Sequence, residues 1–356
     1  MIMFHLKSQS HFPVLAKIRF HPIRSFIVCQ QYRPISISIS RHTPRVSFLK
    51  NTRAFTNSSL YHSNNSFRMD QHQNPETIIA IGQLCSTADI QQNLLTCQRL
   101  AKEASEQGAK ALFLPEATDY ITTPGSPPTS LSLALPMATS PFVLGLQSSA
   151  KEYSLAINVG IHVPNASGNK VLNRSIWISE SGDIVGQYDK VHLFDYAAAG
   201  LKESDSVEAG KKVGGPVETC VGKVGLLICF DLRFPTASLH LRTRNTQILT
   251  YPSAFTIPTG LLHWETLLRA RAIETQSYVI AAAQVGSHNA KRESYGHSMV
   301  VDPLGRVVLD MGGAGDVEGE VNTLAGGKLG IARIDLGKVS EAREKMPLMA
   351  RTDVYE

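Results

Sequence analysis

The apolar residues of this chain follow two different periods, which together predict a mixed α/β fold. Short apolar runs bounded by turn-forming residues predict strands. We expect strands over residues 77–84, 110–114, 155–163, 171–179, 184–188, 224–228, 247–251, 278–284, 297–301, 306–310 and 329–334. Apolar positions three and four apart predict helices from Asp89 to about Gln107 and over residues 142–153, 236–244, 263–275 and 336–345.

The first predicted helix carries recognisable signals at both ends. Asp89 stands in the N-cap position, with Gln92 three residues later, and Gly108 follows the last turn. Cys97 falls on the apolar face of this helix together with leucine and alanine residues. We therefore expect Cys97 to be a packing residue and not a second reactive thiol.

Turn-rich segments separate several of these elements. Residues 165–169 and 181–183 lie between predicted strands, and such consecutive hairpins indicate antiparallel pairing inside an otherwise alternating α/β chain. Residues 118–141 are rich in Pro, Ser and Thr, and we expect a loop near the mouth of a site. Residues 194–215 predict a loop over that site, and residues 312–327 predict a loose glycine-rich loop.

Charge is distributed unevenly along the 356 residues. The formal net charge is +5, but residues 1–69 contain no Asp or Glu and ten Lys or Arg. The remaining body has 25 basic and 30 acidic residues, a net charge of −5. The acid-free, Arg- and Ser-rich composition predicts a transit peptide over residues 1–68, with a disordered basic tail as the alternative. A chloroplast is favoured over a mitochondrion, and translation starting at Met69 would give a cytosolic copy.

The composition of the body also narrows the classes of partner. A mildly acidic body gives no reason to expect nucleic acid, and no uncharged apolar run approaches the roughly 20 residues of a membrane helix. The five cysteines form no CxxC pair and no zinc spacing, so we expect reduced thiols in a reducing compartment. The expected partner is a small molecule.

The best candidate for chemistry is Cys229. The buried strand predicted over residues 224–228 ends on it, and Pro235 suits the first turn of a following helix. A thiol at such a corner is exposed but rigidly held, and a nearby helix N-terminus favours the thiolate. The alternative is that Cys229 is a small core residue, because free cysteine is commonly buried.

A nucleophilic thiol needs a base and a group that stabilises an oxyanion. Glu116 follows the apolar run of residues 111–114, and Lys190 lies between short mixed segments. Each alone is a weak signal, because such residues are usually solvated. None of the histidines considered in the body can be placed beside Cys229 from sequence, so a Cys-His protease is disfavoured.

Three segments in the order Glu, Lys, Cys resemble the motifs of the nitrilase (carbon–nitrogen hydrolase) superfamily. They are residues 114–116 (LPE), 189–193 (DKVHL) and 229–235 (CFDLRFP). Residues 249–255, 263–276 and 295–303 are similar to the Nit branch, which includes the deaminated glutathione amidases. The resemblance covers about residues 77–351 and implies one domain with an α-β-β-α sandwich, two sheets between layers of helices. It also implies pairing into homodimers or higher homo-oligomers.

The resemblance implies a role for each matched residue. Glu116 would be the proton acceptor, Cys229 the nucleophile, and Lys190 the oxyanion stabiliser and proton donor, helped by the backbone N–H of Phe230. The mechanism requires no metal or organic cofactor. The superfamily commonly has a second glutamate between the Lys and the Cys. Glu203 is the preferred candidate for it, and Glu208 competes.

The same resemblance implies an amidase acting on deaminated glutathione, a repair of a transaminase side product. Its dianionic substrate needs cations, and Arg233 is the first candidate, although a structural ion pair with Asp231 or a neighbour is an equal alternative. Arg269, Arg271 and Arg292 are further candidates. The alternatives in function are an ω-amidase of 2-oxoglutaramate, a nitrilase proper, and a catalytically silent scaffold of the same fold.

Overall fold

The computed structural model describes residues 76–123, 125–196, 201–313, 326–349 and 351–354. The predicted transit peptide and most of the predicted glycine-rich loop at residues 312–327 lie outside the described residues. Within these ranges, no helix has both the length and the apolar character that crossing a membrane requires.

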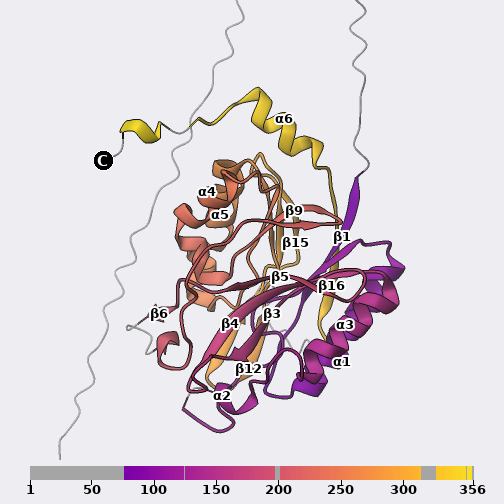
Figure 1. Cartoon of the computed structure of the whole chain (residues 1–356), viewed down its shortest axis with the longest axis vertical. Helices are drawn as coiled ribbons and strands as arrows, with labels where there is room; N and C mark the ends of the chain where they lie inside the picture. The colour runs from indigo at the N-terminus through magenta and orange to yellow at the C-terminus, as the bar shows by residue number, and fades with distance from the viewer. Residues whose placement is uncertain (1–75, 124, 197–200, 314–325, 350, 355–356) are drawn as a thin grey trace, which may run out of the picture. The chain divides into compact units, whose positions relative to one another are not determined.

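Two six-stranded sheets form the inner layers of the described part of the chain (Figure 1). The first sheet has the spatial order β16 (Lys328–Ile334), β1 (Thr77–Gln83), β2 (Ala111–Phe113), β3 (Ala156–Pro164), β4 (Val171–Ile178) and β5 (Ile184–Asp189). The second has the order β15 (Val307–Asp310), β14 (Met299–Val301), β11 (Tyr278–Ala281), β10 (Ile248–Thr250), β9 (Gly222–Leu226) and β8 (Val217–Thr219). Each sheet contains three parallel neighbours, β1-β2-β3 in the first and β9-β10-β11 in the second.

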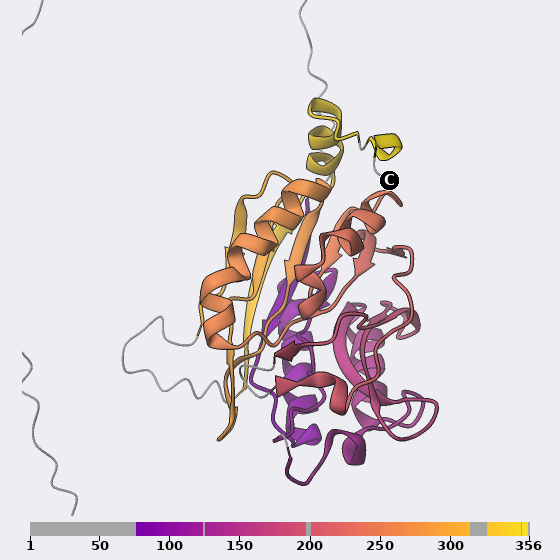
Figure 2. The ribbon, with the colours of Figure 1, turned by 90° about the vertical axis from the view of Figure 1, so that its left-hand side faces the viewer.

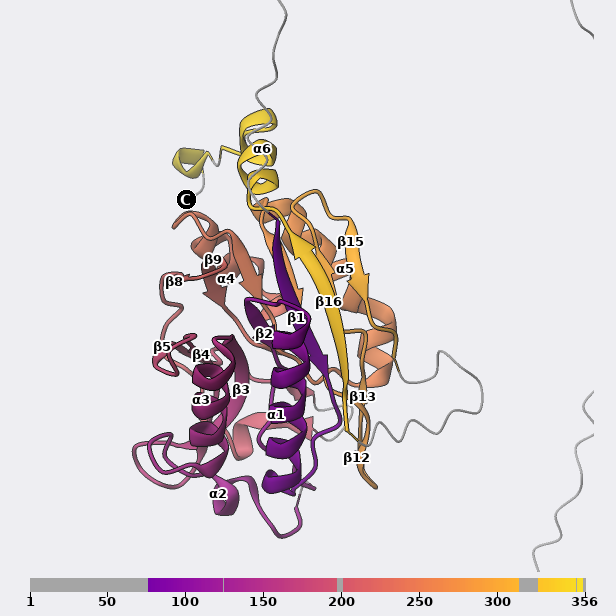
Figure 3. The same cartoon turned by 90° about the vertical axis from the view of Figure 1, so that its right-hand side faces the viewer.

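Helices cover the outer face of each sheet. α1 (Ile90–Glu106) and α3 (Pro141–Tyr153) lie over the first sheet (Figure 3), and α4 (Pro235–Arg242) and α5 (Ile257–Thr275) lie over the second (Figure 2). These four helices are the crossovers that parallel strands require. The predicted α/β class and α-β-β-α sandwich are confirmed. α6 (Gly337–Lys345) follows β16.

Strand β1 shows why the sequence gives this layering. Ile79 and Ile81 belong to the core between the sheets, where Leu226 of β9 also lies. Ala80 belongs to the core beneath the helices, together with Leu100 of α1. A strand buried on both faces appears as a continuous apolar run, as residues 77–84 do.

The predicted local signals agree well with the structure. Asp89 is the N-cap of α1 and accepts a hydrogen bond from the Gln92 N–H at 3.0 Å, and Gly108 follows with a φ of 75°. Cys97 is fully buried in the core under the helices, as expected. The two predicted hairpins join β3 to β4 and β4 to β5, all antiparallel.

Helix α5 begins at Ile257, six residues before the predicted start at residue 263. Pro258 and Gly260 weaken the helical pattern in this turn. However, a proline fits the first turn of a helix, and a Cβ on Gly260 would lie 2.3 Å from the Tyr295 ring. The glycine is therefore required by a tertiary contact that sequence cannot show.

A hairpin of β12 (Val285–Asn289) and β13 (Arg292–Tyr295) was not predicted. The predicted strand at residues 278–284 ends at Ala281, and the one predicted from residue 297 begins at Met299. His297 takes a positive φ of 55°, which is incompatible with a regular strand.

The two predicted loops contain short elements of their own. Residues 118–141 include a helix, α2 (Ser130–Leu133). Residues 194–215 include the strand pair β6 (Asp195–Tyr196) and β7 (Leu201–Lys202), followed by a 3-10 turn at Glu203–Asp205. This turn places the Glu203 carboxylate beside Lys190.

Gly160 of β3 allows the segment after β2 to approach very closely. A Cβ at this position would lie 2.6 Å from Glu116 Cα and 2.8 Å from the Pro115 carbonyl oxygen. Both contacts are with backbone atoms, which cannot rotate away. The position of Glu116 therefore depends on the absence of a side chain at residue 160.

We predict that Gly160→Ala lowers the free energy of unfolding by about 1–3 kcal/mol, as overpacking does. Gly214→Ala is the matched control, because no atom lies within 4 Å of the added methyl group. Urea unfolding of both variants measures the difference. Equal stability of the two variants would contradict the close approach.

Candidate active site

Cys229 lies three residues after the end of β9, in a tight turn. It starts a 3-10 helix at Cys229–Arg233, and α4 follows with Pro235 in its first turn. Cys229 has a φ of 43°, a left-handed conformation that is uncommon for a residue other than glycine. Its N–H donates to the Pro252 carbonyl oxygen at 3.0 Å. A strained backbone at a buried thiol is typical of a functional position.

Asp231 joins this turn to the segment that carries Lys190. Its carboxylate is fully buried and accepts hydrogen bonds from the Ile228 N–H at 2.9 Å and the Tyr188 hydroxyl at 2.8 Å. It also accepts the His192 N–H at 3.1 Å and lies 2.7 Å from His192 Nδ1. Asp231 therefore links the turn to the segment that carries Lys190 through hydrogen bonds. It is not the ion-pair partner considered for Arg233.

Glu116 follows β2 of the first sheet and is 4% exposed. Its Oε1 accepts hydrogen bonds from Lys190 Nζ and Asn173 Nδ2, both at 2.8 Å. Its Oε2 accepts the Ala254 N–H at 2.9 Å. The carboxylate is thus fixed by donors from both sheets.

Lys190 is 2% exposed and is bound by two carboxylates. Nζ lies 2.8 Å from Glu116 Oε1 and 2.9 Å from Glu203 Oε2. Glu203 also accepts hydrogen bonds from the Phe194 N–H at 2.7 Å and from Asn173 Nδ2 at 3.0 Å. Glu208 instead accepts from Asn165 Nδ2 at 2.6 Å. Of the two acids considered, the structure brings Glu203 to Lys190.

The protonation states follow from burial and from these partners. Burial alone would raise the pKa of Glu116, but Lys190 and hydrogen bonds from Lys190, Cys229 and Asn173 bring that pKa below its ordinary value. Burial alone would lower the pKa of Lys190, but Glu116 and Glu203 raise it well above its ordinary value. At neutral pH Glu116 is therefore a carboxylate and Lys190 an ammonium.

The expectation that a helix N-terminus favours a Cys229 thiolate is wrong for the resting protein. Burial raises the pKa of the thiol, the Glu116 carboxylate raises it further, and Lys190 opposes them. The proton therefore stays on sulfur, next to a carboxylate that is positioned to take it. Attack by this thiol requires transfer of the proton to Glu116.

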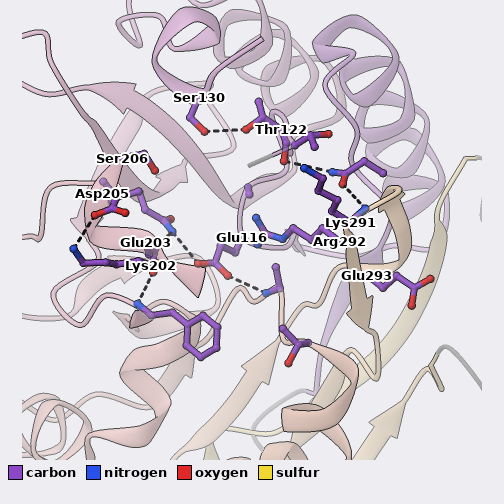
Figure 4. A pocket seen from close by; sticks show the side chains of 18 of the residues that line it. Glu116, Thr122, Ser130, Lys202, Glu203, Asp205, Ser206, Lys291, Arg292 and Glu293 are labelled. Atoms are coloured by element: carbon purple, nitrogen blue, oxygen red, sulfur yellow. Dashed lines mark hydrogen bonds and ion pairs between the residues drawn. The ribbon is translucent and has the colours of Figure 1, made fainter. Parts of the chain in front are cut away.

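A cavity of about 960 Å³ opens above the cluster (Figure 4). Its wall includes Glu116, Lys190, Glu203 and Cys229. A much smaller recess of about 20 Å³ shares Phe194, Cys229, Ala254 and Thr256 with the cavity and also contains Phe230, Arg233, Phe255 and Thr259. The thiol therefore lies where two compartments meet.

The structure separates the candidate arginines. Arg233 lines the recess, near His263 Nδ1 at 3.3 Å and over the rings of Phe230 and Phe255. Arg292 lines the larger cavity. Arg269 is bound to Glu265 and Arg271 to Glu274, and neither lines either compartment.

Sequence reasoning missed several polar partners of the cluster. Asn173 of β4 donates to both glutamates, and its position opposite His162 in the β3–β4 register puts both on the wall of the cavity. Asp119 lies 3.0 Å from His162 Nδ1. The sequence signal that could have revealed this site was Asn173, a polar residue at an inward position of an apolar strand. In the described ranges no three His, Cys, Asp or Glu side chains are grouped to hold a metal.

We predict that Glu116→Gln lowers the pKa of the Cys229 thiol. The substitution removes a negative charge that raises this pKa, while Lys190 keeps Glu203 and its own positive charge. Alkylation of Cys229 by iodoacetamide is measured as a function of pH. The pH at which its rate is half-maximal should fall by about 1 pH unit or more. Glu203→Gln is the control that leaves the carboxylate beside sulfur in place. A midpoint that rises in Glu116→Gln would contradict the electrostatics described.

Comparisons with known proteins agree with this geometry. The Carbon-nitrogen hydrolase family matches residues 78–344. The probable hydrolase nit2 of Schizosaccharomyces pombe is 41% identical over 283 residues, which cover 78% of this chain and 99% of that protein. The deaminated glutathione amidase of Homo sapiens is 41% identical over 287 residues, covering 78% of this chain and 83% of the human protein.

A solved structure gives the same result for the fold. The crystal structure of the C. elegans NitFhit protein matches with a TM-score of 0.70 at 39% identity, over 79% of this chain and 66% of that chain. The superfamily predicted from the motifs is thereby confirmed. The chain belongs to the carbon–nitrogen hydrolase family.

Proposed function

We propose that this carbon–nitrogen hydrolase cleaves the amide bond of deaminated glutathione, releasing 2-oxoglutarate and cysteinylglycine. In this substrate the γ-glutamyl amine of glutathione has become a ketone, so the acyl group is 2-oxoglutaryl. The observation that carries the proposal is the buried cluster of Glu116, Lys190 and Cys229 at the base of a large cavity, in a chain 41% identical to a deaminated glutathione amidase.

In the proposed mechanism, sulfur of Cys229 adds to the amide carbonyl carbon while its proton passes to Glu116. Lys190 stabilises the oxygen that becomes negative, together with the backbone N–H of Phe230. Fixed donors of this kind contribute about 3–4 kcal/mol each to the transition state. The lowered pKa of Glu116 supports its role, because it keeps the carboxylate ionised and able to accept the proton.

Collapse of the tetrahedral intermediate breaks the C–N bond. Glu116 gives its proton to the leaving amine, and a thioester to Cys229 remains. Glu116 then takes a proton from water as the water oxygen attacks the thioester, and returns that proton to sulfur when the acid leaves. Two easier steps thereby replace direct hydrolysis of an unreactive amide.

The charge at the recess fits the acyl group. The 2-oxoglutaryl part carries a carboxylate next to its ketone, and Arg233 is the cation that lines the recess beside Cys229. The guanidinium is held by the rings of Phe230 and Phe255 and by His263 Nδ1, which lies 3.3 Å from both Nη atoms, and its remaining N–H groups can bind a carboxylate. We assign the acyl carboxylate to Arg233.

We predict that the full chain prefers deaminated glutathione to 2-oxoglutaramate, which has the same acyl group but releases ammonia. The measurement is kcat/KM for both amides and for a simple nitrile, with Cys229→Ala as the background, in which turnover should be abolished. A tenfold preference for 2-oxoglutaramate, about 1.4 kcal/mol in transition-state binding, would replace the proposal with an ω-amidase. Turnover that survives in Cys229→Ala would refute the thioester mechanism.

We also propose that residues 1–68 direct the chain to an organelle, a chloroplast in preference to a mitochondrion, with a cytosolic form if translation starts at Met69. The support is a leader without acidic residues and rich in Arg and Ser. A fluorescent fusion of the full chain should be imported, and a fusion starting at Met69 should stay in the cytosol. Cytosolic fluorescence from both would contradict the targeting role.

A further inference from the structure

The tip of the β12–β13 hairpin supplies two cations to the larger cavity. Lys291 and Arg292 both line it, and in Figure 4 their side chains extend from the hairpin into the pocket. Within the described residues, neither charged group has an ion-pair or hydrogen-bond partner. The other lysines of the cavity are paired, Lys190 with two glutamates and Lys202 with Asp205. Among the Lys and Arg side chains that line the cavity in the described residues, Lys291 and Arg292 of the hairpin are thus the ones without an ion-pair partner.

The hairpin is anchored at both its base and its tip. At the base, the Val285 N–H donates to the Leu84 carbonyl oxygen at 3.0 Å, and His288 farther along lies 2.8 Å from the Ser86 carbonyl oxygen. Near the tip, Asn289 Nδ2 donates to the Thr122 carbonyl oxygen at 3.4 Å, and Asn289 Oδ1 accepts the Lys291 N–H at 3.0 Å. These contacts hold the two cations over the cavity at little further cost in chain entropy.

One carboxylate in the same turn could reduce this charge. Glu293 also lines the cavity, but it is exposed and hydrogen-bonded to Ser287 of the facing strand. The tip therefore retains an excess of positive charge.

Cys229 lies where the two compartments meet, so an amide bound at its sulfur can reach the charged groups of both. Cys229 belongs to both, Arg233 only to the recess, and Lys291 and Arg292 only to the larger cavity. With the acyl carboxylate at Arg233, the leaving dipeptide is too large for the recess of about 20 Å³ and therefore occupies the larger cavity. An extended cysteinylglycine spans about 7 Å and ends in a carboxylate.

We propose that Lys291 and Arg292 bind the terminal carboxylate of the leaving peptide and thereby select peptide amides over amides that release ammonia. This inference rests on the proposed function, since it assumes that the leaving group is a dipeptide. The interaction contributes to the transition state only when the substrate carries that carboxylate. An amide without it gains nothing from the hairpin.

The test combines a protein variant with a substrate variant. The double variant Lys291→Gln/Arg292→Gln removes the two charges, and a deaminated glutathione with its glycine carboxylate converted to an amide removes the charge they would bind. For the acid, kcat/KM should fall at least tenfold in the double variant, mainly through KM. For the amidated substrate, kcat/KM should already be low in the wild type and should change less than twofold in the variant.

Arg333→Gln is the matched control, because Arg333 is an exposed arginine of β16 that does not line the cavity. It should leave both substrates unaffected, whereas Arg233→Gln should lower kcat/KM for both. Equal losses for acid and amidated substrate in the double variant would overturn the assignment, since the hairpin would then serve the acyl group or the fold.

The measurements distinguish failure of the proposed function from failure of the hairpin assignment. Wild-type protein that hydrolyses other amides and leaves deaminated glutathione intact would refute the proposed function. Wild-type turnover of deaminated glutathione with an unchanged kcat/KM in the double variant would refute the hairpin assignment alone.

Discussion

The structure depends on one buried ammonium group held between two carboxylates. An isolated charge in an apolar interior is strongly unfavourable, and a buried charge is tolerated only with close partners and satisfied hydrogen bonds. Lys190 has Glu116 and Glu203 within 2.9 Å, and Asn173 donates to both acids. Burial and the Glu116 carboxylate raise the pKa of the Cys229 thiol, so the thiol keeps its proton beside the carboxylate that can accept it.

The fold brings the reactive groups together because a strand of each sheet ends beside the active site. Glu116 follows β2 of the first sheet, Cys229 follows β9 of the second, and both are strands of parallel triplets. Contacts between the sheets then fix their relative position. Gln284, which lies beyond β11, donates to the Glu116 carbonyl oxygen at 3.0 Å, and Ala254 N–H binds the Glu116 side chain. The nucleophile and its base are consequently held by the packing of two independent layers.

Local chemistry explains which features the sequence could predict. The strand leading to Cys229, the N-cap at Asp89 and the Glu-Lys-Cys order are properties of short segments, and the structure contains them. Long-range partners have no such signal. Asn173 is 57 residues from Glu116, and Gly260 is helical because the ring of Tyr295 occupies the space of a side chain. The β12–β13 hairpin was missed because its polar residues face a cavity, so the apolar alternation typical of a half-buried strand is absent there.

Net charge and local charge act in opposite directions in this protein. The body after residue 69 is mildly acidic, which would repel a dianion at long range, but such repulsion is screened within about 8–10 Å at physiological salt. At shorter range, Arg233 in the recess and Lys291 and Arg292 in the larger cavity place positive charge in both compartments that meet at Cys229. The reactive cluster is buried, whereas Lys291 and Arg292 stand at the tip of a hairpin. We therefore expect substitution of Lys291 and Arg292 to alter which leaving group is preferred without disturbing the charges that carry out the reaction.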